Sequence, residues 1–399
     1  MNNFEKNAII SGLGISRTGR RTGIPGLELS LEAANAAIND AGGLVADDID
    51  GIITFGDTPP SDVIAGLGAK AADVGFGFAT GGVITPPVMS AILAVAEKNR
   101  ARHVLVYRTV AMLGGAMTEQ PVSALLNPLA DPPAEPRTPG MRRKLKPFED
   151  MDELVCAHAY SAANWLAMHC QRHMDLYGTT KEQLGWLAIN SRRNAGLNPL
   201  AAFREPMTMD DYLASRPVSS PFGLFDCDVP IDGSIALVVS HADFARDCRH
   251  RAVKVEAVGG TYGSGGWFHR DDFPKMASVE AAAEMWARTD LRPSDVDVAE
   301  LYDGFTFLTF AWLEALGFFC EDGEAGPFVE GAKRIALEGE LPLNTYGGQL
   351  SAGRLHGYWL LHEACLQLRG EAGDRQLVRQ PEVAVAAAGG GVRLPDACY

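Results

Sequence analysis

Residues 344–357 read Asn-Thr-Tyr-Gly-Gly-Gln-Leu-Ser-Ala-Gly-Arg-Leu-His-Gly and stand directly before an apolar-periodic segment at residues 358–368. Glycines allow backbone N–H groups to approach a ligand closely. The first turn of a following helix adds unpaired donors and a partial positive charge. The pattern therefore predicts a strand-to-helix turn that holds a ligand and favours a developing negative charge.

The same order of elements occurs earlier in the chain. Gly81-Gly82 precedes an apolar helical segment and a strand at residues 103–107, as Gly347-Gly348 precedes a helical segment and a strand at residues 383–388. We therefore expect two similar halves, residues 1–245 and 246–399, with an irregular loop-domain insertion at about residues 115–195. Alternating strands and helices in each half predict a layered α/β fold with helices on both sides of mixed sheets.

Composition excludes several classes of protein. The 399 residues are 47% hydrophobic and 21% charged, which is enough for two packed units or one large pseudo-symmetric one. A formal net charge of -15 disfavours nucleic acid and anionic membranes as partners. The first ten residues lack a signal pattern, and apolar runs such as residues 88–96 are too short to span a bilayer. Seven scattered Cys argue against a disulfide framework, so we expect a cytoplasmic protein.

The glycine spacing carries a family resemblance. Gly347-Gly348, Gly353 and Gly357 resemble the Gly-Gly-x-x-x-x-Gly-His-Pro-x-Gly loop of thiolases, with Arg354 in place of the His. Residues 232–237 resemble the family's Asp-Gly-Ala segment. The resemblance implies the duplicated thiolase fold, a five-layered αβαβα arrangement, which agrees with the predicted repeat.

The sulfur nucleophiles of thiolases are missing from this chain. The family places a nucleophilic Cys after the first Gly-Gly, at a helix N-terminus, but here the sequence continues Val-Ile-Thr-Pro-Pro at residues 83–87. The second Cys position is Ala387, although Gly389 and Gly390 behind it can still offer amide donors. Covalent acyl-enzyme chemistry is therefore not expected, and Thr85 is expected to cap a helix.

Two tyrosine motifs point to a narrower branch. Tyr302 in Tyr-Asp-Gly-Phe and Tyr346 in residues 344–357 closely resemble the steroid side-chain aldolases of the lipid-transfer-protein branch. This resemblance implies retro-aldol cleavage of a steroid β-hydroxyacyl-CoA to a ring ketone and propionyl-CoA or acetyl-CoA, with no cofactor beyond the thioester substrate. It also implies a small OB-fold and zinc-ribbon partner, and a homodimer within a heterotetramer.

Retro-aldol cleavage needs a base for the hydroxyl, a donor for the enolate oxygen and an acid for the α-carbon. A phenol has a pKa of about 10 and is a poor base unless cations or donors lower that pKa. We expect Arg354 and His356 to do so for Tyr346, which makes Tyr346 the expected base and Tyr302 the expected acid, with the roles open to exchange. His356 is a third candidate, as base or thioester-oxygen donor, or is simply bonded to backbone. The expected substrate-binding residues are Gly347, Gly348, Arg354, Gly389 and Gly390.

Other interpretations stay open. A non-catalytic thiolase-fold subunit could hold acyl-CoA or lipid in a two-protein complex while a partner performs the chemistry. His169 and His173 have the i, i+4 spacing of zinc ligands on a predicted helix at residues 153–177, but no third ligand is evident, so no metal site is expected. The basic residues 142–146 meet the CoA phosphates or form a solvated loop. Asp303 is expected to cap a helix.

Overall fold

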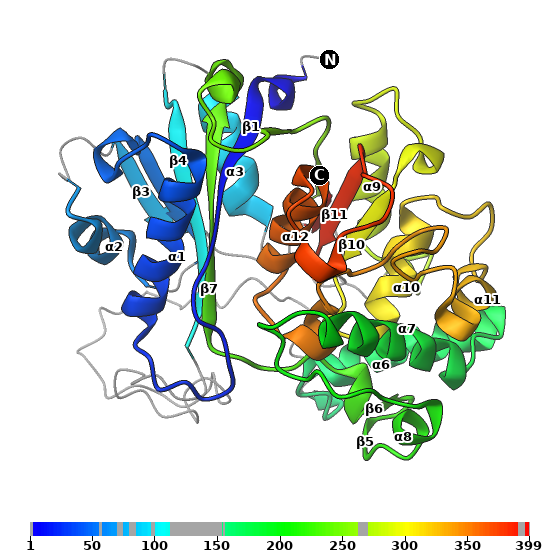
Figure 1. The fold of residues 1–399 in the computed structure, drawn as a ribbon. Helices are drawn as coiled ribbons and strands as arrows, with labels where there is room; N and C mark the ends of the chain where they lie inside the picture. Colours follow the sequence, from blue (N-terminus) through cyan, green and yellow to red (C-terminus); the bar gives the residue numbers. More distant parts are fainter. Residues whose placement is uncertain are drawn as a thin grey trace, which may run out of the picture.

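The computed structural model describes residues 3–55, 58–69, 75–79, 85–96, 100–111, 154, 156–261, 270–389 and 396–398. Two sheets stand side by side with two helices between them (Figure 1). The first sheet has the order β3-β2-β4-β7-β1-β8 and the second β10-β11-β12-β9. Their strands are β1 (Ala8–Ile15), β2 (Gly51–Thr54), β3 (Phe76–Ala79), β4 (His103–Val110), β7 (Gly233–His241), β8 (Val253–Lys254), β9 (Gly259–Thr261), β10 (Val298–Leu301), β11 (Ala384–Ala388) and β12 (Asp396–Cys398).

The two sheets share one topology. In the first, β2 and β4 run parallel and β4, β7 and β1 antiparallel; in the second, β10 and β11 run parallel and β11, β12 and β9 antiparallel. A parallel bridge from Ala299 to Leu343 occupies the place that β3 has beside β2. The predicted duplication is therefore confirmed in the strand order. Residue 245 lies between β7 and β8, and β8 still pairs with β1, so the exact division of the halves stays a prediction.

Side-chain alternation along the strands builds five layers. On β4, Leu105 and Tyr107 pack against α1 (Gly26–Ala41), whereas Val104 and Val106 face the central helices α3 (Thr85–Ala96) and α12 (Tyr358–Arg369). On β11, Val385 and Ala387 pack against the outer helix α10 (Thr306–Ala315), beside α9 (Ser278–Trp286). The order helix, sheet, helix pair, sheet, helix is the predicted αβαβα arrangement (Figure 1).

A smaller loop domain covers one end of the second half (Figure 1). Its elements are α6 (Ala162–Tyr177), α7 (Lys181–Gly196), α8 (Met209–Leu213), β5 (Pro217–Ser219) and β6 (Phe222–Gly223). The predicted continuous helix at about residues 153–177 is wrong: Leu154 and Cys156 are helical, but residues 157–161 are not. The Asn164 side chain accepts from the Ser161 N–H at 3.1 Å at the start of α6, which begins at Ala162. Residues 112–153, including the predicted basic segment 142–146, lie outside the described residues.

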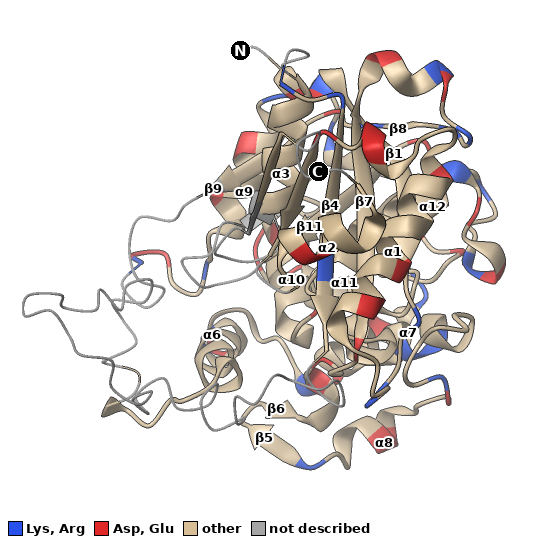
Figure 2. Cartoon of the chain, turned by 90° about the vertical axis from the view of Figure 1, so that its left-hand side faces the viewer, with Lys and Arg blue, Asp and Glu red and all other residues tan. Residues whose placement is uncertain are grey.

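Charged residues of both signs are interspersed around the periphery of the described ribbon (Figure 2). Across the described ranges, none of the helices combines the length and the apolar character that crossing a membrane requires.

Candidate active site

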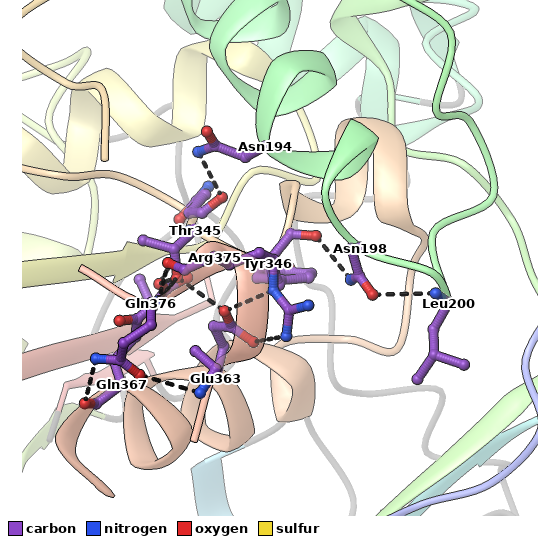
Figure 3. A network of polar contacts seen from close by, with 12 residues as sticks. Asn194, Asn198, Leu200, Thr345, Tyr346, Glu363, Gln367, Arg375 and Gln376 are labelled. Carbon is purple, nitrogen blue, oxygen red and sulfur yellow. Dashed lines mark hydrogen bonds and ion pairs between the residues drawn. The ribbon is translucent and has the colours of Figure 1, made fainter. Parts of the chain in front are cut away.

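The end of α7 holds the backbone of residues 343–346. Asn194 Nδ2 donates to the carbonyl of Leu343 at 3.0 Å and to that of Asn344 at 3.2 Å. Asn198 Nδ2 donates to the carbonyl of Tyr346 at 2.8 Å (Figure 3). The loop domain therefore fixes the position of the Tyr346 backbone through the side-chain amides of Asn194 and Asn198.

Gly347 and Gly348 are required by packing. Their φ angles are +107° and +60°, a region that favours glycine. A Cβ on Gly347 would lie 2.5 Å from the Cβ of Ala195, and one on Gly348 would lie 1.9 Å from Oδ2 of Asp303. The expected part of these glycines in substrate binding stays a prediction.

Asp303 holds the turn on which Tyr346 is placed. Its carboxyl accepts from the backbone N–H of Gln349 at 2.8 Å and of Leu350 at 3.5 Å, in the wide helical turn η8 (Gly348–Ala352). It therefore caps η8, not α10, which begins just after it. Burial raises the pKa of Asp303 to about 7, although these hydrogen bonds oppose the rise.

Tyr346 is a fully buried, neutral phenol. Its ring stacks on Trp359 with 5.1 Å between centroids, and its hydroxyl has no hydrogen-bond partner among the residues that the structure describes. Burial, and then the charges of Asp303, Glu300 and Glu363, raise its pKa well above the ordinary value. The expectation that Arg354 and His356 lower this pKa is wrong, because the charged groups that act on Tyr346 are carboxyls, which raise it.

Two buried glutamates lie beneath Tyr346. Thr345 donates to Oε1 of Glu300 through its N–H at 3.0 Å and lies 2.7 Å from the same oxygen through Oγ1. Glu363 forms a bidentate pair with Arg375, both contacts at 2.9 Å (Figure 3). Burial and the Glu363 charge raise the pKa of Glu300 well above its ordinary value. We infer that Glu300 is protonated and that Arg375 balances the charge of Glu363.

Tyr302 lies beside a cation, in contrast to Tyr346. Arg354 NH1 donates to Oδ1 of Asp228 at 3.2 Å, and the Tyr302 ring lies against Gly304, where a Cβ would come within 2.7 Å of the ring. Burial and the Asp228 carboxylate raise the pKa of Tyr302, whereas Arg354 and the Gln349 amide lower it. The guanidinium that we expected at Tyr346 therefore acts on Tyr302.

Asp228 is a site residue that the sequence did not reveal. Its backbone N–H donates to the carbonyl of Gly304 at 3.0 Å, and the N–H of Arg354 donates to the carbonyl of Val229 at 2.8 Å. Through these backbone hydrogen bonds, residues 227–230 lie between the segment of Tyr302 and Gly304 and the segment of Arg354. A signal was present, since Asp228 lies only four residues before the recognised Asp232-Gly233 segment.

His356 accepts from the guanidinium of Arg108 at Nδ1, with 3.2 Å to Nε and 2.8 Å to NH2. Burial, then the charges of Arg108 and Arg354, hold the pKa of His356 well below its ordinary value. The ring is therefore neutral, with its proton on Nε2, because Nδ1 is an acceptor. This geometry favours a thioester-oxygen donor over a base.

Unpaired polar atoms gather at this place. In the described ranges the Tyr346 hydroxyl, both amide atoms of Gln349 and Nε of Arg354 are buried without a hydrogen-bond partner. Buried polar groups without partners are uncommon in folded proteins and are expected where a ligand or water binds. Tyr302 and His356 are partly exposed at the edge, and Tyr346 and Gln349 form the buried floor.

The thiolase nucleophile positions hold no sulfur. Ala387 pairs with Leu301 in the sheet, and the carbonyl of Gly389 accepts from Trp312 Nε1 at 3.2 Å. Gly390, Gly81 and Gly82 lie outside the described residues. Cys227 is next to Asp228, but burial raises the pKa of its thiol to about 12, so it is no thiolate.

Two other features lie apart from the phenols. His173 contacts Glu314 at 3.0 Å and Thr179 at 3.0 Å, and His169 contacts the carbonyl of Trp165 at 3.2 Å. In the described parts of the chain no group of three His, Cys, Asp or Glu is placed to hold a metal. A cavity of about 650 Å³ lies between α3, α12 and β8, and none of the described candidate residues lines it.

Comparison with known proteins confirms the fold. Residues 257–397 match the family model described as thiolase C-terminal domain-like. Acetyl-CoA acetyltransferase from Syntrophomonas wolfei superposes with a TM-score of 0.65 at 15% identity, covering 98% of each chain. Fold and site together define a thiolase-fold protein that has no Cys at either nucleophile position.

Two curated relatives match nearly the whole chain. A steroid side-chain-cleaving aldolase from Thermomonospora curvata is 34% identical over 389 residues, covering 91% of this chain and 90% of the relative. The 17-hydroxy-3-oxo-4-pregnene-20-carboxyl-CoA lyase of Mycobacterium tuberculosis is 33% identical over 377 residues, covering 91% and 92%. A solved structure described as an Ltp2-ChsH2(DUF35) aldolase has a TM-score of 0.83 at 30% identity and covers 99% of this chain and 98% of its own. The chain belongs to this family of steroid side-chain-cleaving aldolases, which are carbon-carbon lyases of the thiolase superfamily.

Proposed function

We propose that this chain cleaves the side chain of a steroid β-hydroxyacyl-CoA by a retro-aldol reaction, giving a ring ketone and propionyl-CoA or acetyl-CoA. The observation that carries the proposal is the pair of phenols, partly exposed Tyr302 and buried Tyr346, among unpaired polar atoms in a chain that has no Cys at either thiolase nucleophile position. Proton transfer alone suffices for this cleavage, so the proposal includes no metal and no organic cofactor.

The electrostatics assign the two phenols to different roles. Tyr302 faces the substrate hydroxyl as the proton acceptor, because Arg354 lies beside it and favours negative charge there. Tyr346 is the acid that protonates the α-carbon of the released thioester enolate, because burial and the carboxylates of Asp303 and Glu363 keep its proton in place. These roles are the reverse of those expected from sequence.

The enolate oxygen needs a donor as charge develops on it. In this proposal His356 supplies its Nε2–H, with Arg108 holding the other ring nitrogen. A fixed neutral donor costs no reorganisation during the reaction, and loss of one such donor lowers kcat by about 10²–10³ in acyl transfer enzymes.

The proposal extends to assembly and location. The solved relative at a TM-score of 0.83 is described by two component names. These two names support a two-protein complex for this chain. The homodimer and the small OB-fold and zinc-ribbon partner are proposed from the family resemblance alone. Cytoplasmic location is supported by six cysteines that are free in the described residues, as in a reducing compartment.

The test uses the full chain with its partner and 17-hydroxy-3-oxo-4-pregnene-20-carboxyl-CoA, the compound named for the mycobacterial relative. Its ring hydroxyl is β to the thioester carbonyl, so cleavage releases the 17-ketone and propionyl-CoA in equal amounts, measured by chromatography. Tyr302→Phe and Tyr346→Phe should each lower kcat by about 10²–10⁴. Both should retain binding of the analogue that lacks the 17-hydroxyl.

A result of tight binding without ketone release, in wild type and variants alike, would contradict the proposal. It would favour the alternative, a non-catalytic thiolase-fold subunit that holds acyl-CoA or lipid for a partner.

A further inference from the structure

Neutral Tyr302 can accept the substrate proton only if its own proton leaves at the same time. Its pKa is raised, so a free phenolate is scarce near neutral pH. The groups that act on its hydroxyl electrostatically are Arg354, Gln349, Asp303 and Asp228. A guanidinium accepts no proton, and an amide is a very weak base, so a carboxylate must take the proton.

Of the two carboxyls, Asp303 is already engaged. It accepts from the backbone N–H groups of Gln349 and Leu350 and holds the η8 turn in place. Protonation of Asp303 would weaken the contacts that position the floor of the site.

Asp228 is held differently. Its side chain contacts Arg354 NH1 at 3.2 Å and is 14% exposed, so the pair faces the partly exposed edge of the site. Its N–H is bonded to the carbonyl of Gly304, and the Tyr302 ring lies on Gly304. Asp228 is therefore joined through its N–H to Gly304, where a Cβ would lie 3.4 Å from the Tyr302 hydroxyl oxygen.

We propose that Asp228 is the terminal proton acceptor of the cleavage, acting through Tyr302, and that Arg354 keeps it ionised and in place. The inference rests on the proposed function and adds a residue to it. Asp228 is thus a positioning and relay residue, and Tyr302 remains the group that touches the substrate.

The step balances without a further reagent. The substrate hydroxyl gives its proton to the Tyr302 oxygen while Tyr302 gives its own proton to Asp228. The alkoxide electrons form the ketone C=O, and the carbon-carbon bond electrons pass to the thioester enolate. Tyr346 then protonates the α-carbon, and the proton on Asp228 returns to the Tyr346 phenolate through solvent after product release.

The relay predicts a defined dependence on pH. Burial raises the pKa of Asp228 to about 6, against the lowering influence of Arg354. The described charged or titratable groups that interact with its carboxyl are Arg354, Tyr302 and Cys227. Activity should therefore fall as pH decreases through about 6, because protonated Asp228 cannot accept. A separate change in activity near pH 7 is expected from Asp303, because its pKa is raised to about 7.

The experiment measures kcat and KM from pH 5 to pH 9 for the complex of the full chain with its partner. Asp228→Asn should lower kcat by about 10²–10⁴ and change KM less than about threefold. Its kcat should also no longer fall as the pH decreases through about 6. Asp228→Glu should have a lower kcat that still falls at acidic pH, because it retains a carboxylate. Asp40→Asn is the control, since Asp40 also pairs with an arginine, Arg369, at 2.7 Å, away from the phenols.

The inference is overturned if the kcat of Asp228→Asn still falls as the pH decreases through about 6, or if its loss of rate appears in KM alone. Failure of the wild type to release ketone would instead overturn the proposed function, so the two failures are distinguishable. Binding of the analogue without the hydroxyl, followed by calorimetry, shows that Asp228→Asn is folded.

Discussion

Arg108 donates to Nδ1 of His356 through two guanidinium nitrogens, at 2.8 Å and 3.2 Å. The proton of the neutral ring is therefore on Nε2, where a donor to the enolate oxygen is needed. A Gln amide can place an N–H near the Nε2 position, whereas an Asn amide reaches only the Nδ1 position. We expect His356→Gln to retain about tenfold more kcat than His356→Asn, measured at pH 8 with equal binding of the unreactive analogue.

The backbone conformation at residue 356 separates the effect of lost hydrogen bonding from an effect on folding in these two variants. His356 has a φ of +50°, a conformation that Asn tolerates better than Gln. If folding alone set the activity, His356→Asn would therefore be the better variant. Equal rates, or a faster Asn variant, would exclude the donor role.

Tyr346→Phe should stabilise the protein while it removes activity. The Tyr346 hydroxyl is buried without a partner among the described residues, and an unsatisfied buried group costs about 1–3 kcal/mol. The buried Tyr212 hydroxyl, in contrast, donates to Asp226, so Tyr212→Phe should destabilise by about the same amount. Urea unfolding of both variants measures the two free energies. A destabilised Tyr346→Phe would indicate that the hydroxyl has a structural partner, such as an ordered water.

Gly348→Ala should cost far more stability than the backbone angle alone requires. Its Cβ would lie 1.9 Å from the Asp303 carboxylate, so the η8 turn or Asp303 must move. Gly43 also has a positive φ, +74°, but has nothing within 4 Å of an added Cβ, so Gly43→Ala isolates the cost of φ at about 1–2 kcal/mol. We expect at least about twice that loss for Gly348→Ala in the same unfolding measurement, with kcat lowered as well. Equal losses would contradict the packing argument.

The fold was largely predictable because the two similar halves have short sequence patterns that specify each strand, turn and helix. Alternating apolar residues in β4 and the glycine pairs before α3 and α12 predict strands, turns and helices from near neighbours along the chain. The start of α6 was missed because one capping contact, from Ser161 to Asn164, decides it.

The site was predictable in its residues but not in its electrostatics. Tyr302 and Tyr346 were identified from motifs, but Arg354 was assigned to the nearer tyrosine in sequence. Its partner is Asp228, 126 residues away, and the Glu363 carboxylate acts on Tyr346 from α12. Which charge meets which phenol depends on tertiary contacts, and no local pattern records them.

The carboxyl pair beneath Tyr346 gives a prediction about stability and pH. The pKa of Glu300 is raised in the folded protein, by burial and then by Glu363, above the value of 4.5 that it has when unfolded. As pH rises above about 4.5 the unfolded chain releases this proton and the folded chain keeps it, so this group lowers the free energy of unfolding by up to about 1.4 kcal/mol per pH unit. The loss continues until the folded pKa is reached.

Glu300→Gln keeps the shape and removes the proton equilibrium. The difference in unfolding free energy between Glu300→Gln and wild type should therefore become more favourable from pH 5 to pH 8, as measured by urea unfolding at each pH. Glu363→Gln is the matched comparison: it breaks the bidentate contact with Arg375 and leaves a buried guanidinium, so it should destabilise by about 3–5 kcal/mol. A flat difference for Glu300→Gln would mean that Glu300 is ionised in the fold, and the inference that it is protonated would then be wrong.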